Sequence, residues 1–111
     1  MQTIQTVGSV SVIKAANSLQ GDSLGQCRRS LADCLAKRRS SIVLDLSQSH
    51  LLSSVGLEFM VDAKQQCLAC GGMLVVAGPQ PLCAEILAIT GVDECVAVFQ
   101  DLRSALSDFT K

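Results

Sequence analysis

The chain has 111 residues, a net charge of −1 and 49% hydrophobic residues. This length suits one domain spanning residues 1–111, and the composition is too apolar and too weakly charged for a disordered chain. The near-neutral charge excludes the strongly basic surface with which many proteins bind nucleic acid, so nucleic acid is not an expected partner.

Two short strands are predicted at the start of the chain. They cover Gln2–Thr6 and Val10–Ala15, which are rich in β-branched residues, and Gly8-Ser9 supplies the turn between them. A helix is predicted from Ser23, because Ser23 and Gln26 have the spacing of a capping box. Its apolar stripe consists of Cys27, Leu31, Cys34 and Leu35.

The middle of the chain predicts a strand, a helix and a second strand. Ser41–Leu46 and Met73–Gly78 are short apolar runs, which are typical of strands covered on both faces. The helix between them begins near Ser53 or Ser54 and ends at Gly71-Gly72. We expect its inward positions to be Met60, Ala63, Cys67 and Cys70. The two strands should therefore be parallel, with a right-handed crossover.

The last third of the chain predicts two helices around a strand. The first helix begins near Pro81, stops at Gly91 and presents Leu82, Glu85, Ile86 and Ile89 at helical spacing. Val96–Phe99 forms the strand, and Asp101 opens a final amphipathic helix. The stripe of that helix is Leu102, Ala105, Leu106 and Phe109. The predicted fold class is α/β.

The six cysteines are expected to be free thiols. The N-terminus does not resemble a secretory signal and no stretch is long enough to span a bilayer, so we expect a cytoplasmic protein that does not insert into a membrane. Cys67 and Cys70 have C-x-x-C spacing, but they lie at the end of a predicted helix, where the dipole raises a thiol pKa. Core packing is therefore preferred over redox chemistry, and no metal or cofactor is expected.

The sequence contains few candidate catalytic residues or motifs. Asp45, His50 and Ser54 could be drawn as a triad, but the chain lacks the G-x-S-x-G turn that aims a catalytic serine. It also lacks the common glycine-rich phosphate loops. An enzyme is not expected.

Ser53-Ser54-Val55-Gly56 lies where the predicted strand at residues 41–46 leads into a helix. A serine at this point caps the helix in the simplest interpretation. In the alternative, a phosphate added there would lie beside free backbone amides, so the serine would be a switch.

Several separated motifs resemble the STAS domains of bacterial anti-sigma-factor antagonists. Ile42–Ser47 and Leu51–Leu57 are similar to the family pattern L-D-L-S followed by D-S-[ST]-G-L. Gly71–Pro79 resembles its G-G-x-L-x-L-x-G stretch, and Leu87–Val92 resembles L-x-x-T-G-L. Two positions depart from the pattern, since Ser53 replaces an Asp and Val55 replaces Ser or Thr.

The resemblance implies a mixed sheet of four to five strands flanked by about four helices. It also implies a non-catalytic module that binds an anti-sigma factor, often a GHKL-type serine kinase, with a phosphatase as a further candidate partner. The implied phosphoacceptor is Ser54, with Ser53 as the alternative. The implied contact residues are Ser47, Ser53, Ser54, Gly56, Leu57 and Glu58, and Leu51 or Leu52 could anchor a partner if exposed.

A second function is compatible with the same family. STAS proteins also act as scaffolds of stress-signalling complexes and as subunits of membrane transport assemblies. The sequence does not indicate an oligomeric state.

Overall fold

The computed structural model describes residues 4–16, 18–19 and 21–109. Its main sheet has the strand order β1-β2-β4-β6-β7. These strands are β1 (Ile4–Val7), β2 (Val10–Lys14), β4 (Ser41–Asp45), β6 (Met73–Ala77) and β7 (Val98–Phe99). A small second sheet pairs β3 (Ser18–Leu19) with β5 (Leu51–Leu52). The helices are α1 (Gly21–Ala36), α2 (Ser54–Ala69), α3 (Pro81–Thr90), α4 (Val92–Cys95) and α5 (Leu102–Asp108).

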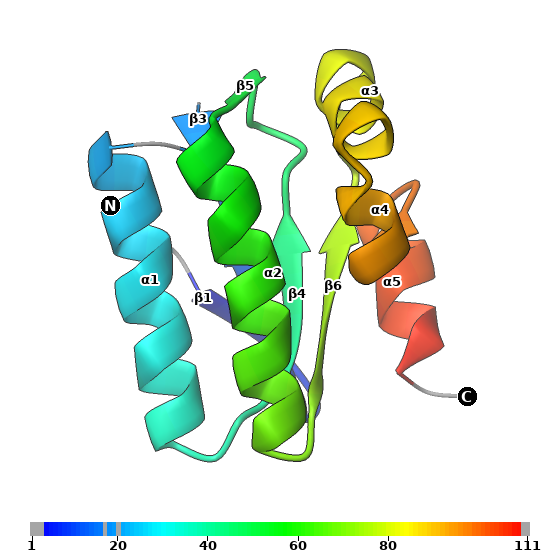
Figure 1. Cartoon of the computed structure of the whole chain (residues 1–111). Coiled ribbons are helices and arrows are strands. Elements are labelled where there is room, and N and C mark those ends of the chain that lie inside the picture. Colours follow the sequence, from blue (N-terminus) through cyan, green and yellow to red (C-terminus); the bar gives the residue numbers. More distant parts are fainter. Residues whose placement is uncertain (1–3, 17, 20, 110–111) are drawn as a thin grey trace.

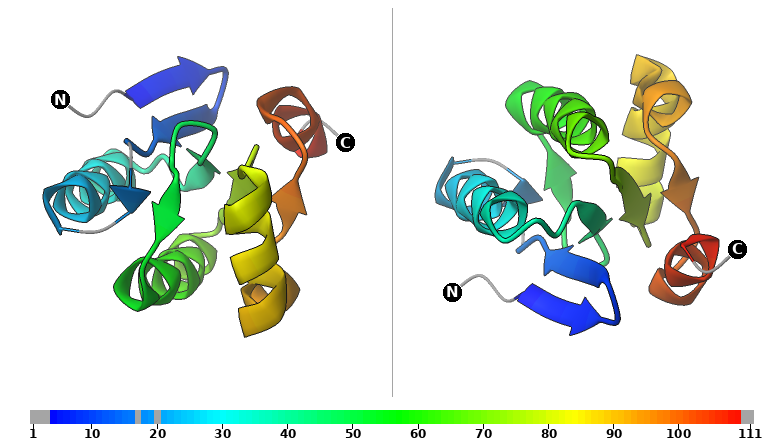
Figure 2. Two further views of the ribbon diagram at one scale, coloured as in Figure 1. Left: turned by 90° about the horizontal axis from the view of Figure 1, so that it is seen from above. Right: turned by 90° about the horizontal axis from the view of Figure 1, so that it is seen from below.

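The main sheet is mixed. β1 is antiparallel to β2, and the remaining neighbours are parallel, including the β4 and β6 pair that was predicted on either side of α2. Helices α1, α2 and α3 lie on one side of the sheet and α5 lies on the other (Figures 1 and 2). This arrangement confirms the predicted α/β class.

The central strands have apolar side chains on both faces because the sheet is covered on both sides. Ile42 and Leu44 belong to the larger core beneath α1 and α2, whereas Val43 packs into a smaller core with Ala105 of α5. All three are fully buried or nearly so. The predicted apolar run in β4 is thus explained by two cores rather than one.

The glycine pair after α2 ends the helix as predicted. Gly71 has φ +86°, a left-handed value that glycine adopts without a steric penalty, and the Gly72 amide donates to the Cys67 carbonyl over 2.8 Å. A Cβ at Gly72 would lie 2.1 Å from the Ser40 carbonyl oxygen. Glycine is therefore required for the turn into β6.

Some predicted boundaries differ from the structure. The first strand is Ile4–Val7, and Gln2 and Thr3 of the predicted strand lie outside the described residues. The strand predicted over Val96–Phe99 is shorter and covers Val98–Phe99. β3, β5 and α4 were not predicted, because segments of two to four residues give no measurable periodicity.

The predicted capping box at Ser23 is wrong. Helix α1 begins at Gly21, so Ser23 lies inside its first turn. The Ser23 hydroxyl is buried and has no hydrogen-bond partner within the described part of the chain. The pairing of β3 with β5 at residues 18–19 is a tertiary contact that the local pattern around Ser23 does not include.

One predicted inward position of α2 is exposed, and so are two apolar residues of α3. Cys70 is the C-cap residue of α2 and faces solvent, although Met60, Ala63 and Cys67 of the same stripe are buried. In α3 the exposed fractions of Leu82 and Ile89 are 54% and 76%, and the buried residues are Cys83 and Leu87. The helix predicted from this spacing is present, but Leu82 and Ile89 lie at the surface while Ile86 packs partly against the larger core.

Candidate functional site

The loop after β4 is shaped by a buried carboxylate. Asp45 is the last residue of β4, and its Oδ1 accepts a hydrogen bond from the Ser47 amide over 2.9 Å. This contact folds the chain into a tight turn of the kind that Asp side chains favour. A Cβ at Gly78, whose φ is +62°, would lie 3.5 Å from the Ser47 Cβ. The left-handed Gly78 therefore brings the end of β6 against this turn.

Two neighbouring segments hold the loop in place. The buried Ser49 donates its hydroxyl to the Ala16 carbonyl over 2.7 Å. From the other side, Gln80 Nε2 donates to the Ser47 carbonyl over 2.9 Å, and Gln80 Oε1 lies 3.1 Å from His50 Nδ1. Residues 47–50 are thus fixed between the end of β2 and the start of α3.

The two serines at the start of α2 have different roles. Ser53 is the N-cap residue, and its hydroxyl accepts from the Gly56 amide over 3.1 Å. Ser54 is the first residue of α2 and is exposed. The capping role predicted for one of the pair belongs to Ser53, which leaves Ser54 as the serine on the outer surface.

The surface around Ser54 is partly apolar. Leu51 and Val55 are each 46% exposed, whereas Leu52 is buried, which settles the alternatives left open for the leucine pair. Of the contact residues implied by sequence, Ser47 and Glu58 are exposed, Leu57 is half-buried and Gly56 is buried. The segment around the start of α2, at the upper edge of the molecule in Figure 1, therefore contains an exposed serine and two exposed apolar residues.

Two of the residues considered for a catalytic triad, Asp45 and His50, have other hydrogen-bond partners. The Asp45 carboxylate accepts from a backbone amide, and the hydrogen bond of the His50 ring is to Gln80. Burial, with a smaller contribution from the Cys70 and Cys34 thiols, raises the pKa of Cys67 to about 11. A thiol with such a pKa is a poor nucleophile at neutral pH. Among the residues that the structure describes, no group of three His, Cys, Asp or Glu side chains could hold a metal ion.

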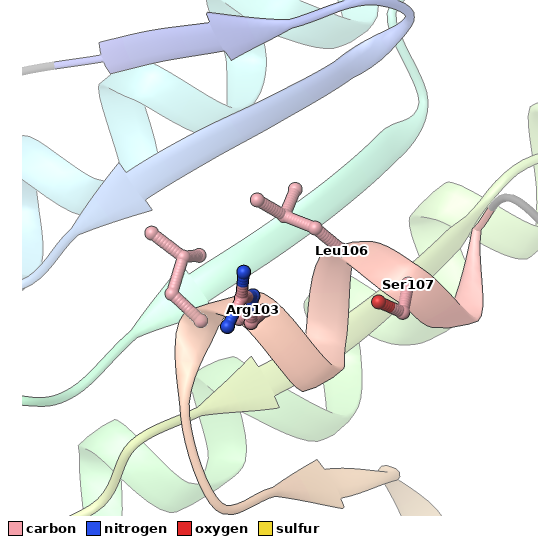
Figure 3. A pocket seen from close by; sticks show the side chains of 4 residues that line it. Arg103, Leu106 and Ser107 are labelled. Carbon is pink, nitrogen blue, oxygen red and sulfur yellow. The ribbon is translucent and has the colours of Figure 1, made fainter.

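The hollow beside α5 lies away from this loop. It has a volume of about 390 Å³ and is lined by Leu102, Arg103, Leu106 and Ser107. Figure 3 shows Leu106 pointing from α5 toward the strands. This hollow adjoins the smaller core rather than the Ser54 surface.

A comparison with protein-family models identifies the family of the chain. The model of the STAS domain matches residues 2–105, which is nearly the whole sequence. The chain belongs to the STAS domain family. No protein of curated function matches the sequence significantly. No helix within the described ranges is long and apolar enough to cross a membrane.

Solved STAS structures share the fold at low sequence identity. A candidate anti-sigma factor antagonist of Thermotoga maritima superposes with a TM-score of 0.86 and 19% identity, covering 99% of this chain and 95% of its own. SpoIIAA of Bacillus, an anti-sigma factor antagonist solved in unphosphorylated and phosphorylated forms, gives a TM-score of 0.82 for the unphosphorylated form. That comparison has 13% identity and covers 99% of this chain and 96% of SpoIIAA. A chain of the stressosome, a signal integration and transduction hub, gives a TM-score of 0.78 and 20% identity, covering 97% and 96%.

Sequence reasoning missed the contacts that support the loop. Gln80 precedes the proline that opens α3, and no pattern in the sequence indicates that its amide reaches Ser47 and His50. The burial of Ser49 was also not predicted, because it depends on the Ala16 carbonyl, 33 residues away. The motif around Ser53 and Ser54 was identified from sequence, but only the coordinates distinguish the two hydroxyls.

Proposed function

We propose that this STAS protein is a cytoplasmic, non-catalytic partner-switching regulator of the anti-sigma-factor-antagonist type. In its unmodified state it binds an anti-sigma factor that is also a GHKL-type serine kinase. Phosphorylation of Ser54 breaks that contact, and a phosphatase restores it. The observation that carries the proposal is the exposure of Ser54 at the start of α2 while Ser53 is engaged as the helix cap.

The surroundings of Ser54 suit a docking surface. The exposed side chains of Leu51 and Val55 provide apolar area that a partner can cover. Leu82, in the first turn of α3, adds a further exposed apolar side chain, and the start of α3 is joined to the loop through Gln80 and Cys83. We assign the contact surface to the loop from Ser47 and to the first two turns of α2, which include Gly56, Leu57 and Glu58.

A phosphate on Ser54 would oppose binding for two physical reasons. It brings about −1.5 to −2 charges into a contact that otherwise covers Leu51 and Val55, and those charges lose water when the partner docks. Glu58 lies one helical turn after Ser54, so the phosphate also adds to a negative charge on the same helix face. A modest difference in binding free energy between the two forms is enough for a switch.

The proposal is tested by intact-mass measurement after incubation with the cognate kinase and ATP. We expect one added phosphate in the wild type and in Ser53→Ala, and none in Ser54→Ala. Ser54→Glu should weaken kinase binding by at least about tenfold, and Gln65→Glu on the exposed side of α2 is the matched charge control. Phosphate that persists in Ser54→Ala would reject the assignment of Ser54.

The alternative is a STAS scaffold or a subunit of a stress-signalling or membrane transport complex. The stressosome chain, which has the same fold, supports this alternative. A scaffold would bind its partners without modification. Stable co-purification with an ATPase or signalling subunit, unchanged in Ser54→Glu, would support this function over the switch.

A further inference from the structure

The outer strand of the main sheet, β1, has an unpaired side. Among the residues that the structure describes, it pairs with β2 only and forms one end of the strand order. Figure 2 shows it at the periphery of the molecule, with no other ribbon beyond it. Its sequence, Ile-Gln-Thr-Val, contains no charged residue and no proline, and these are common means of preventing edge pairing. An extended strand can therefore add to this edge.

The rows of apolar side chains that run across the sheet are buried in the inner strands and become exposed at β1. Val76, Leu44, Ile13 and Ile4 are register partners across four strands. The exposed fraction is 1% at Ile13 and rises to 38% at Ile4. On the other face Val10 is 5% exposed, whereas its partner Val7 is 43% exposed. Both faces of β1 thus hold side chains that a further strand would cover.

The hairpin formed by β1 and β2 is hydrogen-bonded to the segment that follows α1. Arg39, which follows α1, donates from Nε to the Ser11 hydroxyl over 2.9 Å and from a terminal guanidinium nitrogen to the Gly8 carbonyl over 3.0 Å. These bonds tie the turn and the second strand of the hairpin to the α1–β4 connection. The turn that joins β1 to β2 is therefore anchored, which lowers the entropic cost of ordering β1 when it pairs.

We propose that the β1 edge pairs with β1 of a second copy of this chain. The two strands run antiparallel about a two-fold axis at Gln5, so that Ile4 faces Thr6 of the other copy and Gln5 faces Gln5. Facing residues then lie on the same side of the joined sheet, as an antiparallel ladder requires. Since the strand is uncharged, no like charges meet within the ladder.

Charge complementarity on the α1 side favours a second copy over another occupant. A hollow of about 240 Å³ beside β1 is lined by Ile4, Thr6, Asp33 and Lys37 together with Ser11, Cys34 and Arg39. Asp33 and Lys37 are one helical turn apart and are exposed. In the proposed dimer Asp33 of each copy faces Lys37 of the other, because both residues line the hollow beside β1 and the two-fold axis reverses their order. An isologous interface of this kind is self-complementary.

Sedimentation equilibrium of the full chain tests the dimer. We expect a concentration-dependent rise in mass from 11.7 kDa toward twice that value. Gln5→Glu, which places two carboxylates together at the axis, should raise the dissociation constant at least about tenfold. Gln65→Glu makes the same change on the exposed side of α2 and should leave the dissociation constant unchanged.

A charge exchange tests the proposed orientation. Asp33→Lys should weaken the dimer, and the double variant Asp33→Lys with Lys37→Asp should restore it, because the complementary pairing is re-established. Far-ultraviolet circular dichroism of each variant checks that the monomer remains folded.

A wild-type chain that is monomeric at every concentration overturns the proposal, and so does a dimer that Gln5→Glu leaves intact. Monomers whose β1 edge instead binds a strand of another protein would also overturn it. This test does not involve Ser54, so its outcome is independent of the proposed switch.

Discussion

Ser53 and Ser54 are adjacent in the chain, yet their hydroxyls have different surroundings. Ser53 has extended backbone angles, φ −92° and ψ 166°, which aim its oxygen at the amides of the first helical turn. Ser54 has already entered the helix and is exposed. A one-residue difference therefore separates a structural role from a candidate modification site.

Removal of the Ser53 hydroxyl should destabilise the protein. We expect Ser53→Ala to lower the free energy of unfolding by about 1 kcal/mol, because the Gly56 amide loses its acceptor. Ser53→Asp should retain most of the stability, since a carboxylate also caps a helix and favours its N-terminus. Urea denaturation measures both values, and Ser54→Ala is the neighbouring control. Equal stability of Ser53→Ala and wild type would contradict the capping role.

At the scale of elements, α3 illustrates what periodicity can and cannot reveal. Leu82, Ile86 and Ile89 have helical spacing, and the helix they predict exists. Spacing identifies a face of a helix, but the rest of the fold decides whether that face turns inward. In α3 the buried core residues are Cys83 and Leu87, and Ile86 packs partly against the same core, whereas Leu82 and Ile89 are left at the surface.

This orientation of α3 predicts unequal effects of substitution. Ile89→Lys should change the free energy of unfolding by less than about 0.5 kcal/mol, because the side chain is 76% exposed. Leu87→Ala should cost about 2–5 kcal/mol, because it leaves a cavity beneath the helix. Thermal or urea denaturation of the two variants provides the comparison. A larger loss for Ile89→Lys than for Leu87→Ala would mean that the helix is turned the other way.

At the scale of the whole molecule, the cysteines are distributed mainly by packing. Cys27, Cys34, Cys67 and Cys83 are buried, whereas Cys70 and Cys95 are exposed. Burial raises the pKa of Cys27 to about 11. Of the C-x-x-C pair, one thiol lies in the core and the other faces solvent, so the core interpretation holds for Cys67 and not for Cys70.

Thiol titration should reveal this distribution. In the native protein at neutral pH we expect a disulfide reagent such as Ellman's to react rapidly with Cys70 and Cys95 only. All six cysteines should react after unfolding in guanidinium chloride. The double variant Cys70→Ser/Cys95→Ser should lose the rapid phase. Rapid reaction of four or more thiols in the folded protein would contradict the described packing.

The sequence by itself determined the elements with strong local signals. The apolar runs of β4 and β6, the glycines after α2, and Asp101, whose side chain accepts from the Ser104 amide over 2.8 Å, were all predicted correctly because their causes lie within a few residues. The family was also recognised from motifs spread along the chain. The tertiary structure alone decided the start of α1, the β3–β5 pair, the packing of α3 and the support of the Ser54 loop by Ser49 and Gln80. Most of these features depend on partners about 30 residues away, which local patterns do not include, and the packing of α3 depends on which of its apolar residues the rest of the core reaches.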